Sequence, residues 1–212
     1  MNVDPLARWY RWIEYLVFGR ALERARFQFL GELSAARRVL VLGEGDGRVL
    51  ERILAIAPEA QVDVIELSAE MIALARRRIG IDTIRVNFHH VDARSAPWPP
   101  GLYDAVVMNF FLDCFSEAEA ALLIATAVSQ STANTTWLVT DFAVPKAGWR
   151  RWHAVAYVKI MYYFFHLTTA LQTQHLPDID RLLMSAKLQR LDAVVYRGGL
   201  IRAERWAKYG GS

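Results

Sequence analysis

Short apolar runs alternate with amphipathic stretches through the first two thirds of the chain. Runs rich in Val, Ile, Leu and aromatic residues predict buried strands, and the residues between them have helical spacing. The predicted strands cover residues 39–42, 61–66, 84–88, 103–111 and 137–142. Because strands that alternate with helices usually run parallel, this pattern favours an α/β fold around a mostly parallel sheet.

The pattern changes near the end of the chain. Two further strand-like runs, 191–196 and 200–206, follow each other with only Gly198-Gly199 and their neighbours between them. A glycine pair between two such runs is typical of a β-hairpin. We therefore expect the sheet to end with an antiparallel pair.

Polar residues mark the starts of two helices within the core. Ser68 precedes a predicted helix over 69–79, where its hydroxyl can accept a hydrogen bond from a free backbone N–H. Ser116 and Glu119 have the spacing of a capping box and predict a helix over 117–127.

Two aromatic-rich helical stretches lie outside this core. Residues 5–33 have helical spacing, and we expect them to cover one edge of the sheet or to close over a bound cofactor. Residues 144–176 crowd Trp, Tyr, Phe and His residues, and a further helix is predicted over 179–188. The favoured interpretation is a helical cap over a substrate site.

The second stretch raises the question of a membrane. It approaches the length of a membrane span. However, Lys159 and His166 lie inside it, and a charge in the centre of a bilayer is costly. We therefore expect no integral span, while contact with a membrane surface stays open.

A glycine loop follows the first predicted strand. Gly43, Gly45 and Gly47 alternate with Glu44 and Asp46, and a predicted helix begins directly afterwards. A strand, a glycine loop and a helix N-terminus together predict a site for a nucleotide-like cofactor.

The glycine spacing narrows the choice of cofactor. The dinucleotide fingerprint G-x-G-x-x-G needs a third glycine where this chain has Arg48, and a phosphate-binding P-loop needs a Gly-Lys-Ser/Thr sequence that is absent here. Glu66 ends the second predicted strand 19 residues after Gly47, and a carboxylate in this position can accept hydrogen bonds from both hydroxyls of a ribose.

The G-x-G-x-G spacing resembles motif I of the class I S-adenosylmethionine-dependent methyltransferases. Glu66, Asp92 after the third strand, and the final hairpin occur in the order of that family. The resemblance implies a seven-stranded, mostly parallel Rossmann-like sheet with an antiparallel C-terminal hairpin and helices on both faces. One residue departs from the family pattern, since Val41 stands where motif I often has an acid. Glu44 is the expected substitute.

The resemblance also implies one methyltransferase domain in four parts: an N-terminal helical lid (1–36), a cofactor-binding core (37–142), an aromatic-rich helical substrate cap (143–187) and the hairpin (188–212). It implies S-adenosylmethionine as cofactor and S-adenosylhomocysteine as product. The residues expected to bind the cofactor are Gly43, Glu44, Gly45, Asp46, Gly47, Glu66, Leu67, Met71, Asp92, Ala93, Asn109, Phe110, Tyr10 and Arg20.

Methyl transfer would then proceed by in-line attack of an oxygen, nitrogen or sulfur nucleophile. The aromatic-rich segment favours a small, apolar or aromatic acceptor. Asp113, which follows the fourth strand, and the two histidines His153 and His166 are the candidate catalytic bases. An aromatic ring at Phe110 can face a sulfonium through cation–π attraction.

Composition adds few constraints. Hydrophobic residues make up 54% of the 212 residues, which fits an ordered protein, and the net charge of +3 is too small and scattered to predict nucleic-acid binding. Cys114 is the single cysteine, and no signal-peptide pattern begins the chain, so we expect a cytoplasmic protein. We expect a monomer or homodimer.

Metal binding is not expected. His89 and His90 are adjacent in a predicted strand and should point to opposite faces, where they cannot readily share one ion.

Three other interpretations remain open at this stage. The protein can be a non-catalytic S-adenosylmethionine-binding protein, a nucleotide-dependent oxidoreductase, or a methyltransferase that works at a membrane surface on a lipid or quinone precursor.

Overall fold

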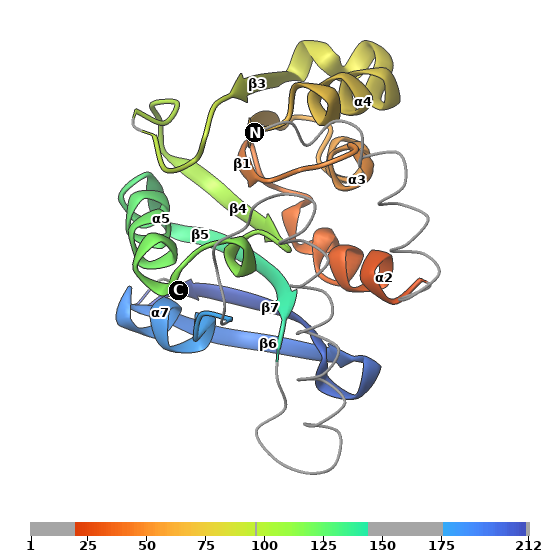
Figure 1. Cartoon of the computed structure of the whole chain (residues 1–212). Helices are drawn as coiled ribbons and strands as arrows, with labels where there is room; N and C mark the ends of the chain where they lie inside the picture. Colours follow the sequence, from red (N-terminus) through yellow and green to blue (C-terminus); the bar gives the residue numbers. More distant parts are fainter. Residues whose placement is uncertain (1–19, 96, 144–175, 211–212) are drawn as a thin grey trace.

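A computed structural model describes residues 20–95, 97–143 and 176–210 (Figure 1). Seven strands form one sheet in the order β3-β2-β1-β4-β5-β7-β6. β1 pairs in parallel with β2 and β4, β2 with β3, and β4 with β5, whereas β7 pairs antiparallel with β5 and β6. The strands are β1 (Arg38–Leu42), β2 (Gln61–Glu66), β3 (Val86–His90), β4 (Tyr103–Asn109), β5 (Ser131–Phe142), β6 (Leu188–Tyr196) and β7 (Ile201–Lys208).

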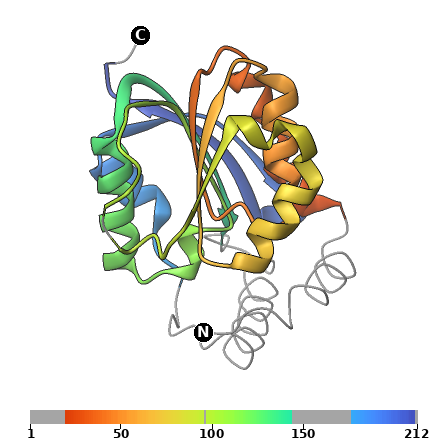
Figure 2. The ribbon, with the colours of Figure 1, turned by 90° about the horizontal axis from the view of Figure 1, so that it is seen from above.

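Helices cover both faces of the sheet, as Figure 2 shows from above. α2 (Ala21–Phe27), α3 (Arg48–Ile56) and α4 (Ala69–Ile79) lie on one face, and α5 (Glu117–Ser129) and α7 (Ile179–Ser185) lie on the other. Four short 3₁₀ turns complete the described elements: η1 (Leu30–Leu33), η2 (Gly80–Arg85), η3 (Leu112–Cys114) and η4 (Arg197–Gly199). The seven-stranded α/β fold predicted from the sequence is confirmed.

Alternate residues of β1 build two hydrophobic cores. Leu40 and Leu42 pack in the core under α5 and α7, whereas Val39 and Val41 pack in the core under α3. This division follows from the strand geometry, because successive side chains point to opposite faces. Val41, which stands where motif I often has an acid, therefore lies in an apolar core with 2% of its surface exposed.

Local sequence signals define several boundaries. The Ser116 hydroxyl and the Glu119 carboxylate form the predicted capping box at the start of α5, and the Ser68 hydroxyl caps α4 by accepting from the Met71 N–H. The predicted hairpin is confirmed as the antiparallel pair β6 and β7.

Several predicted boundaries were wrong, among them the start of the fifth strand, which lies at Ser131 rather than at residue 137. The third strand begins at Val86 rather than Ile84, whose side chain is 88% exposed in η2. The fourth strand stops at Asn109, because the next residue, Phe110, turns to φ 52°. The helix predicted over 179–188 ends at Ser185, since Lys187 at φ 61° redirects the chain into β6.

The helix predicted over 5–33 is described only from residue 20. There, α2 ends at Phe27, and the chain continues through η1 instead of extending the helix. The remainder of the predicted lid, and the predicted aromatic cap between residues 144 and 175, lie outside the described residues. Among the residues that the structure describes, none of the helices combines the length and apolarity that a membrane crossing requires.

Candidate functional site

The glycine loop joins the carboxyl end of β1 to the start of α3. Gly43, Gly45 and Gly47 have φ values of 69°, 71° and 87°, in the left-handed region that L side chains rarely adopt. Gly47 is also the N-cap residue of α3. The sharp turn therefore depends on glycine at these three positions.

The three glycines differ in the space around them. A Cβ at Gly43 would lie 2.7 Å from Cδ2 of Phe111, and a Cβ at Gly47 would lie 2.6 Å from Cα of Ala75. A Cβ at Gly45 would meet nothing within 4 Å. The first and third glycines thus allow close packing of the loop, whereas the second faces open space beside the loop backbone.

Glu66 ties the loop to the end of β2. Its Oε2 accepts a hydrogen bond from the Gly45 N–H (3.1 Å), and its Oε1 accepts one from the Ser68 N–H (2.9 Å). Each carboxylate oxygen has a second lone pair. Glu66 can therefore hold the loop and still accept hydrogen bonds from a ligand.

Two other acids of the loop have opposite environments. Glu44 Oε1 accepts from the Leu50 N–H (2.9 Å), but Oε2 is buried without a hydrogen-bond partner, and burial raises the pKa of this carboxyl to about 8. Asp46 contacts Arg48 (3.0 Å) and Arg78 (3.1 Å). Although burial opposes it, these two guanidinium groups hold the pKa of Asp46 below its usual value.

The end of β4 lies beside the loop, because Leu42 pairs with Met108. Asn109 follows, and its Oδ1 is another buried oxygen without a partner. Phe110 adopts φ 52°, a conformation that costs a non-glycine residue about 1–2 kcal/mol. Its backbone N–H donates to the Thr140 carbonyl (2.7 Å), and its ring contacts Phe142 with a centroid separation of 4.9 Å.

Two buried carboxyl groups meet near the ends of β4 and β5. Asp113 in η3 is 7% exposed and Asp141 in β5 is 5% exposed. Burial raises the pKa of Asp113 to about 6. Burial, followed by the negative charge of Asp113, raises the pKa of Asp141 well above its usual value.

Asp141 was missed as a site residue when the sequence was interpreted. It was assigned only to the strand over 137–142. The available signal was an acid next to the carboxyl end of an otherwise apolar central strand, where ligands of open α/β sheets usually bind.

The remaining predicted cofactor residues lie near the start of α4, just before α2 and after β3. Leu67 is exposed, Met71 is half-buried in the first turn of α4, and Arg20 is exposed just before α2. Asp92 forms an ion pair with Arg94 (2.6 Å), which also reaches Glu119 (3.1 Å).

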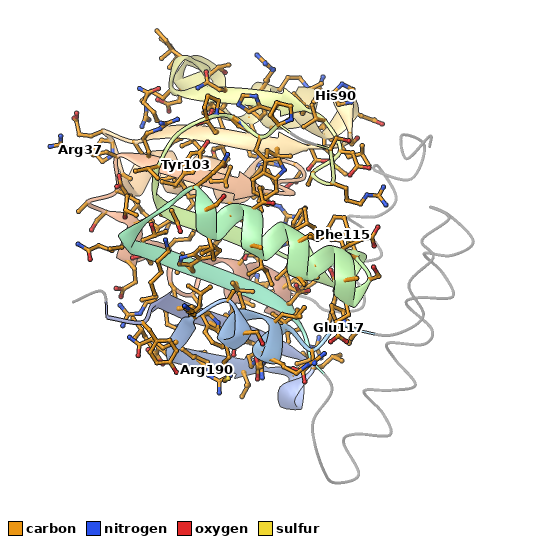
Figure 3. All side chains as sticks on the ribbon, turned by 90° about the vertical axis from the view of Figure 1, so that its left-hand side faces the viewer. Arg37, His90, Tyr103, Phe115, Glu117 and Arg190 are labelled. Atoms are coloured by element: carbon orange, nitrogen blue, oxygen red, sulfur yellow. The ribbon has the colours of Figure 1, made fainter. Side chains whose placement is uncertain are left out.

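Neighbouring Ala93 is buried, and its carbonyl accepts a hydrogen bond from the indole N–H of Trp98 (2.7 Å). Figure 3 shows His90, Phe115 and Glu117 spread along one side of the molecule, with Arg37 and Tyr103 on the opposite side. Tyr10, His153 and His166 lie outside the described residues.

The adjacent histidines have separate partners. His89 Nε2 lies 2.9 Å from Asp63 Oδ1, and His90 Nε2 lies 3.0 Å from the Leu67 carbonyl oxygen. Within the described ranges, no group of three or more His, Cys, Asp or Glu side chains is arranged to hold a metal ion.

Comparison with known proteins agrees with this geometry. The family described as "Methyltransferase domain" matches residues 39–132, from β1 into the start of β5. Over this range the chain is similar to that methyltransferase family. The match spans the glycine loop, Glu66, Asp92 and Asp113, so the part of the chain that resembles the family holds most of the candidate site.

The curated relatives include methyltransferases and aminopropyltransferases. A demethylmenaquinone methyltransferase from Thermus thermophilus is 34% identical over 108 residues, which cover 50% of this chain and 49% of that protein. A polyamine aminopropyltransferase 2 from Bacillus anthracis is 34% identical over 83 residues, 35% of this chain and 23% of that protein. The matches thus span half or less of these relatives.

Solved structures extend the likeness in fold. An O-methyltransferase family protein from Burkholderia thailandensis has a TM-score of 0.67 at 18% identity, covering 99% of this chain and 59% of that one. The N-methyltransferase NodS from Bradyrhizobium japonicum, solved with S-adenosylhomocysteine, has a TM-score of 0.64 at 16% identity, covering 89% and 88%. At such identities the likeness shows a shared fold.

The close packing of Gly47 gives a first prediction. Gly47→Ala should lower the free energy of unfolding by about 2–4 kcal/mol, because the new Cβ adds a backbone overlap to the cost of a left-handed alanine. Gly45→Ala is the matched control, since Gly45 also has positive φ (71°) in the same loop but a Cβ there would meet nothing within 4 Å. It should cost only about 1–2 kcal/mol. Chemical denaturation measures both, and equal losses would contradict the packing argument.

The burial of Glu44 gives a second prediction. Its pKa is higher in the folded protein than in the unfolded chain, so the folded state binds more protons between about pH 4.5 and pH 8 and loses stability as pH rises through this window. Glu44→Gln removes this titration and retains an oxygen for the Leu50 N–H. As pH rises through this window, the free energy of unfolding of the variant should therefore increase relative to that of wild type by up to about 1.4 kcal/mol per pH unit. Parallel pH profiles for the two proteins would refute the assignment.

Proposed function

We propose that this protein binds S-adenosylmethionine and transfers its methyl group to a small-molecule acceptor. One observation carries the proposal: Glu66 holds a loop of three left-handed glycines at Gly45, and the space beside Gly45 is open. This arrangement offers a backbone surface and a diol-binding carboxylate to the same ligand. The methyltransferase domain match supports the identity of that ligand.

The described residues fit such a cofactor. Glu66 would accept hydrogen bonds from the ribose hydroxyls, and Leu67 and Met71 would contact the adenine, with Asp92 and Ala93 near its amino group. The methionine end carries an ammonium group, which needs acceptors. Two buried oxygens without partners, Glu44 Oε2 and Asn109 Oδ1, stand at the ends of neighbouring strands and would supply them, with Glu44 releasing its proton as the ammonium binds.

The other predicted cofactor residues would complete the site. Gly43 and Gly47 shape the loop, and Asp46 would act through its ion pairs with Arg48 and Arg78, which brace the loop against α3 and α4. Tyr10 and Arg20 are proposed to reach the methionine carboxylate from the N-terminal segment.

Binding would serve catalysis mainly by alignment. S-adenosylmethionine supplies an activated methyl group, which a nucleophile takes by in-line displacement. The chain's contribution is to hold both reactants in register, which can lower the barrier by several kcal/mol. The guanidinium of Arg26 already lies over the Phe110 ring, 5.0 Å from its centroid, so only the opposite face of this ring could favour the sulfonium.

For the acceptor we propose a small, apolar or aromatic molecule with an oxygen, nitrogen or sulfur nucleophile. Residues 143–187 are proposed to cap it, and Asp113, His153 and His166 are the candidate bases. A lipid or quinone precursor at a membrane surface is the second candidate, favoured by the demethylmenaquinone methyltransferase among the relatives. Co-sedimentation with liposomes distinguishes the two, because only the second predicts binding to vesicles.

Calorimetric titration tests the cofactor directly. Wild type should bind S-adenosylmethionine and S-adenosylhomocysteine at micromolar concentrations and should not bind NAD. Glu66→Ala should weaken both sulfur ligands about tenfold or more, roughly 1.4 kcal/mol. Glu66→Gln keeps an oxygen for the loop and should bind with an intermediate affinity. Glu59→Ala, which removes an exposed glutamate outside the site, should bind like wild type.

The outcomes separate the competing functions. If folded protein binds neither sulfur ligand, the proposed function is wrong. Tight binding without turnover on any acceptor would indicate a non-catalytic binding protein. Decarboxylated S-adenosylmethionine, a donor suited to aminopropyl transfer, should bind more weakly than S-adenosylmethionine, and the reverse order would favour an aminopropyltransferase.

A further inference from the structure

Two isoleucines of η2 are almost fully exposed. Ile81 and Ile84 have 92% and 88% of their surfaces in solvent, although the hydrophobic pattern predicted that Ile84 begins a buried strand. A single exposed apolar side chain is common on protein surfaces, but two such residues on one short turn form a protruding apolar pair. Burial of this pair requires a surface that η2 and its neighbouring elements do not provide.

Positive charge surrounds the two isoleucines. Residues 76–85 contain four arginines, Arg76, Arg77, Arg78 and Arg85, and one acid, Asp82. Arg78 and Arg85 form ion pairs within the described fold, and Arg76 lies over an aromatic ring, which leaves its charge in place. Arg77 is exposed in the last turn of α4 and forms no ion pair with any residue that the structure describes.

The strand order places two further exposed residues at the same edge of the sheet. η2 leads into β3, whereas Arg37 directly precedes β1 and Leu102 directly precedes β4, with 59% of the leucine exposed. Because these three strands are parallel, their amino ends meet at one edge, and Figure 3 shows Arg37 on the side of the molecule opposite His90, which ends β3. We name this surface the amino-edge patch, and its members are Arg37, Arg77, Ile81, Ile84 and Leu102.

We propose that the amino-edge patch binds the surface of a membrane that contains anionic lipids. Ile81 and Ile84 insert at the boundary between headgroups and acyl chains, and Arg37 and Arg77 meet the lipid phosphates. Membrane surfaces bind proteins through buried apolar area together with attraction between basic residues and anionic headgroups. A guanidinium can also form two parallel hydrogen bonds to one phosphate.

Other partners fit the patch less well. A nucleic acid provides phosphates, but protruding isoleucines gain nothing from its charged backbone. A second copy of the chain, docked symmetrically, would place Arg77 near its own counterpart, and like charges would oppose the contact. A stable protein interface also buries roughly 1,200–2,000 Å² in total, of which one short turn provides a small part. The combination of protruding apolar residues and basic neighbours therefore favours a lipid surface.

This contact would orient the domain. Arg37 and Gly43 flank opposite ends of β1, so a domain held by its amino edge presents the glycine loop to the aqueous side. The inference goes beyond the proposed function and does not depend on it. Because the contact requires anionic lipid, co-sedimentation with neutral vesicles still distinguishes the two acceptors proposed above.

Co-sedimentation of the full chain with vesicles of two compositions tests the inference. Wild type should bind vesicles of phosphatidylserine and phosphatidylcholine at least tenfold more tightly than vesicles of phosphatidylcholine alone. Added salt should weaken this binding, because it screens exposed charges. The double variant Ile81→Ser/Ile84→Ser should weaken it at least tenfold, since it removes the inserted apolar area. Arg77→Gln should weaken it about fivefold.

Leu122→Ser is the matched control. Leu122 is 69% exposed on α5, outside the patch, and its replacement should leave vesicle binding unchanged. An unchanged unfolding midpoint would show that each variant is folded, as expected for substitutions at exposed positions. The inference is overturned if wild type does not prefer anionic vesicles, or if the double variant and Arg77→Gln both bind them like wild type. Loss of a DNA complex or of a dimer in these variants, without vesicle binding by wild type, would assign the patch to those partners instead.

Discussion

The hydrogen bond from the Gly45 N–H to the Glu66 carboxylate connects the two strand ends on which the candidate site is built. A hydrogen bond to a charged acceptor contributes about 1.5–3 kcal/mol, enough to select one shape for a short loop. That loop shape is accessible only because Gly43, Gly45 and Gly47 tolerate positive φ. The same bond positions Glu66, so the loop and the proposed ribose acceptor are set by one interaction.

A second constraint is electrostatic. The carboxyl edge of β1, β4 and β5 gathers the half-buried Glu44 and the buried Asp113 and Asp141, and burial raises the pKa of each carboxyl. Buried acids are costly unless a donor or a cation meets them. The proposed cofactor provides positive charge through its sulfonium and its ammonium group. The loop acid Asp46 differs because Arg48 and Arg78 already neutralise it.

Much of the fold was predictable because its signals are local. Val39 to Leu42 shows a buried strand, Ser68 and the Ser116–Glu119 pair show helix starts, and Gly198-Gly199 shows a hairpin. Errors arose where backbone conformation overrides residue type. Nothing in the apolar character of Phe110 indicates φ 52°, and apolar Ile84 lies exposed in a 3₁₀ turn.

The candidate site was only partly predictable. The loop and Glu66 follow from spacing along the chain, and so does Asp113 after the fourth strand. The partnership of Asp113 with Asp141 could not be predicted, because it depends on how η3 folds back over β5. Likewise, the ion pairs of Asp46 and the unpartnered oxygen of Glu44 depend on packing between α3, α4 and the loop. Spacing locates residues at one edge of a sheet but does not reveal which of them touch.

The central claim is that the glycine loop binds S-adenosylmethionine and S-adenosylhomocysteine. The most direct measurement is the change in backbone amide chemical shifts of glycine-labelled protein during titration with S-adenosylhomocysteine. We expect large, saturable changes at Gly43, Gly45 and Gly47, with the largest at Gly45, and none at Gly31 or Gly80. Folded protein whose loop glycines stay unchanged at saturating ligand would contradict it.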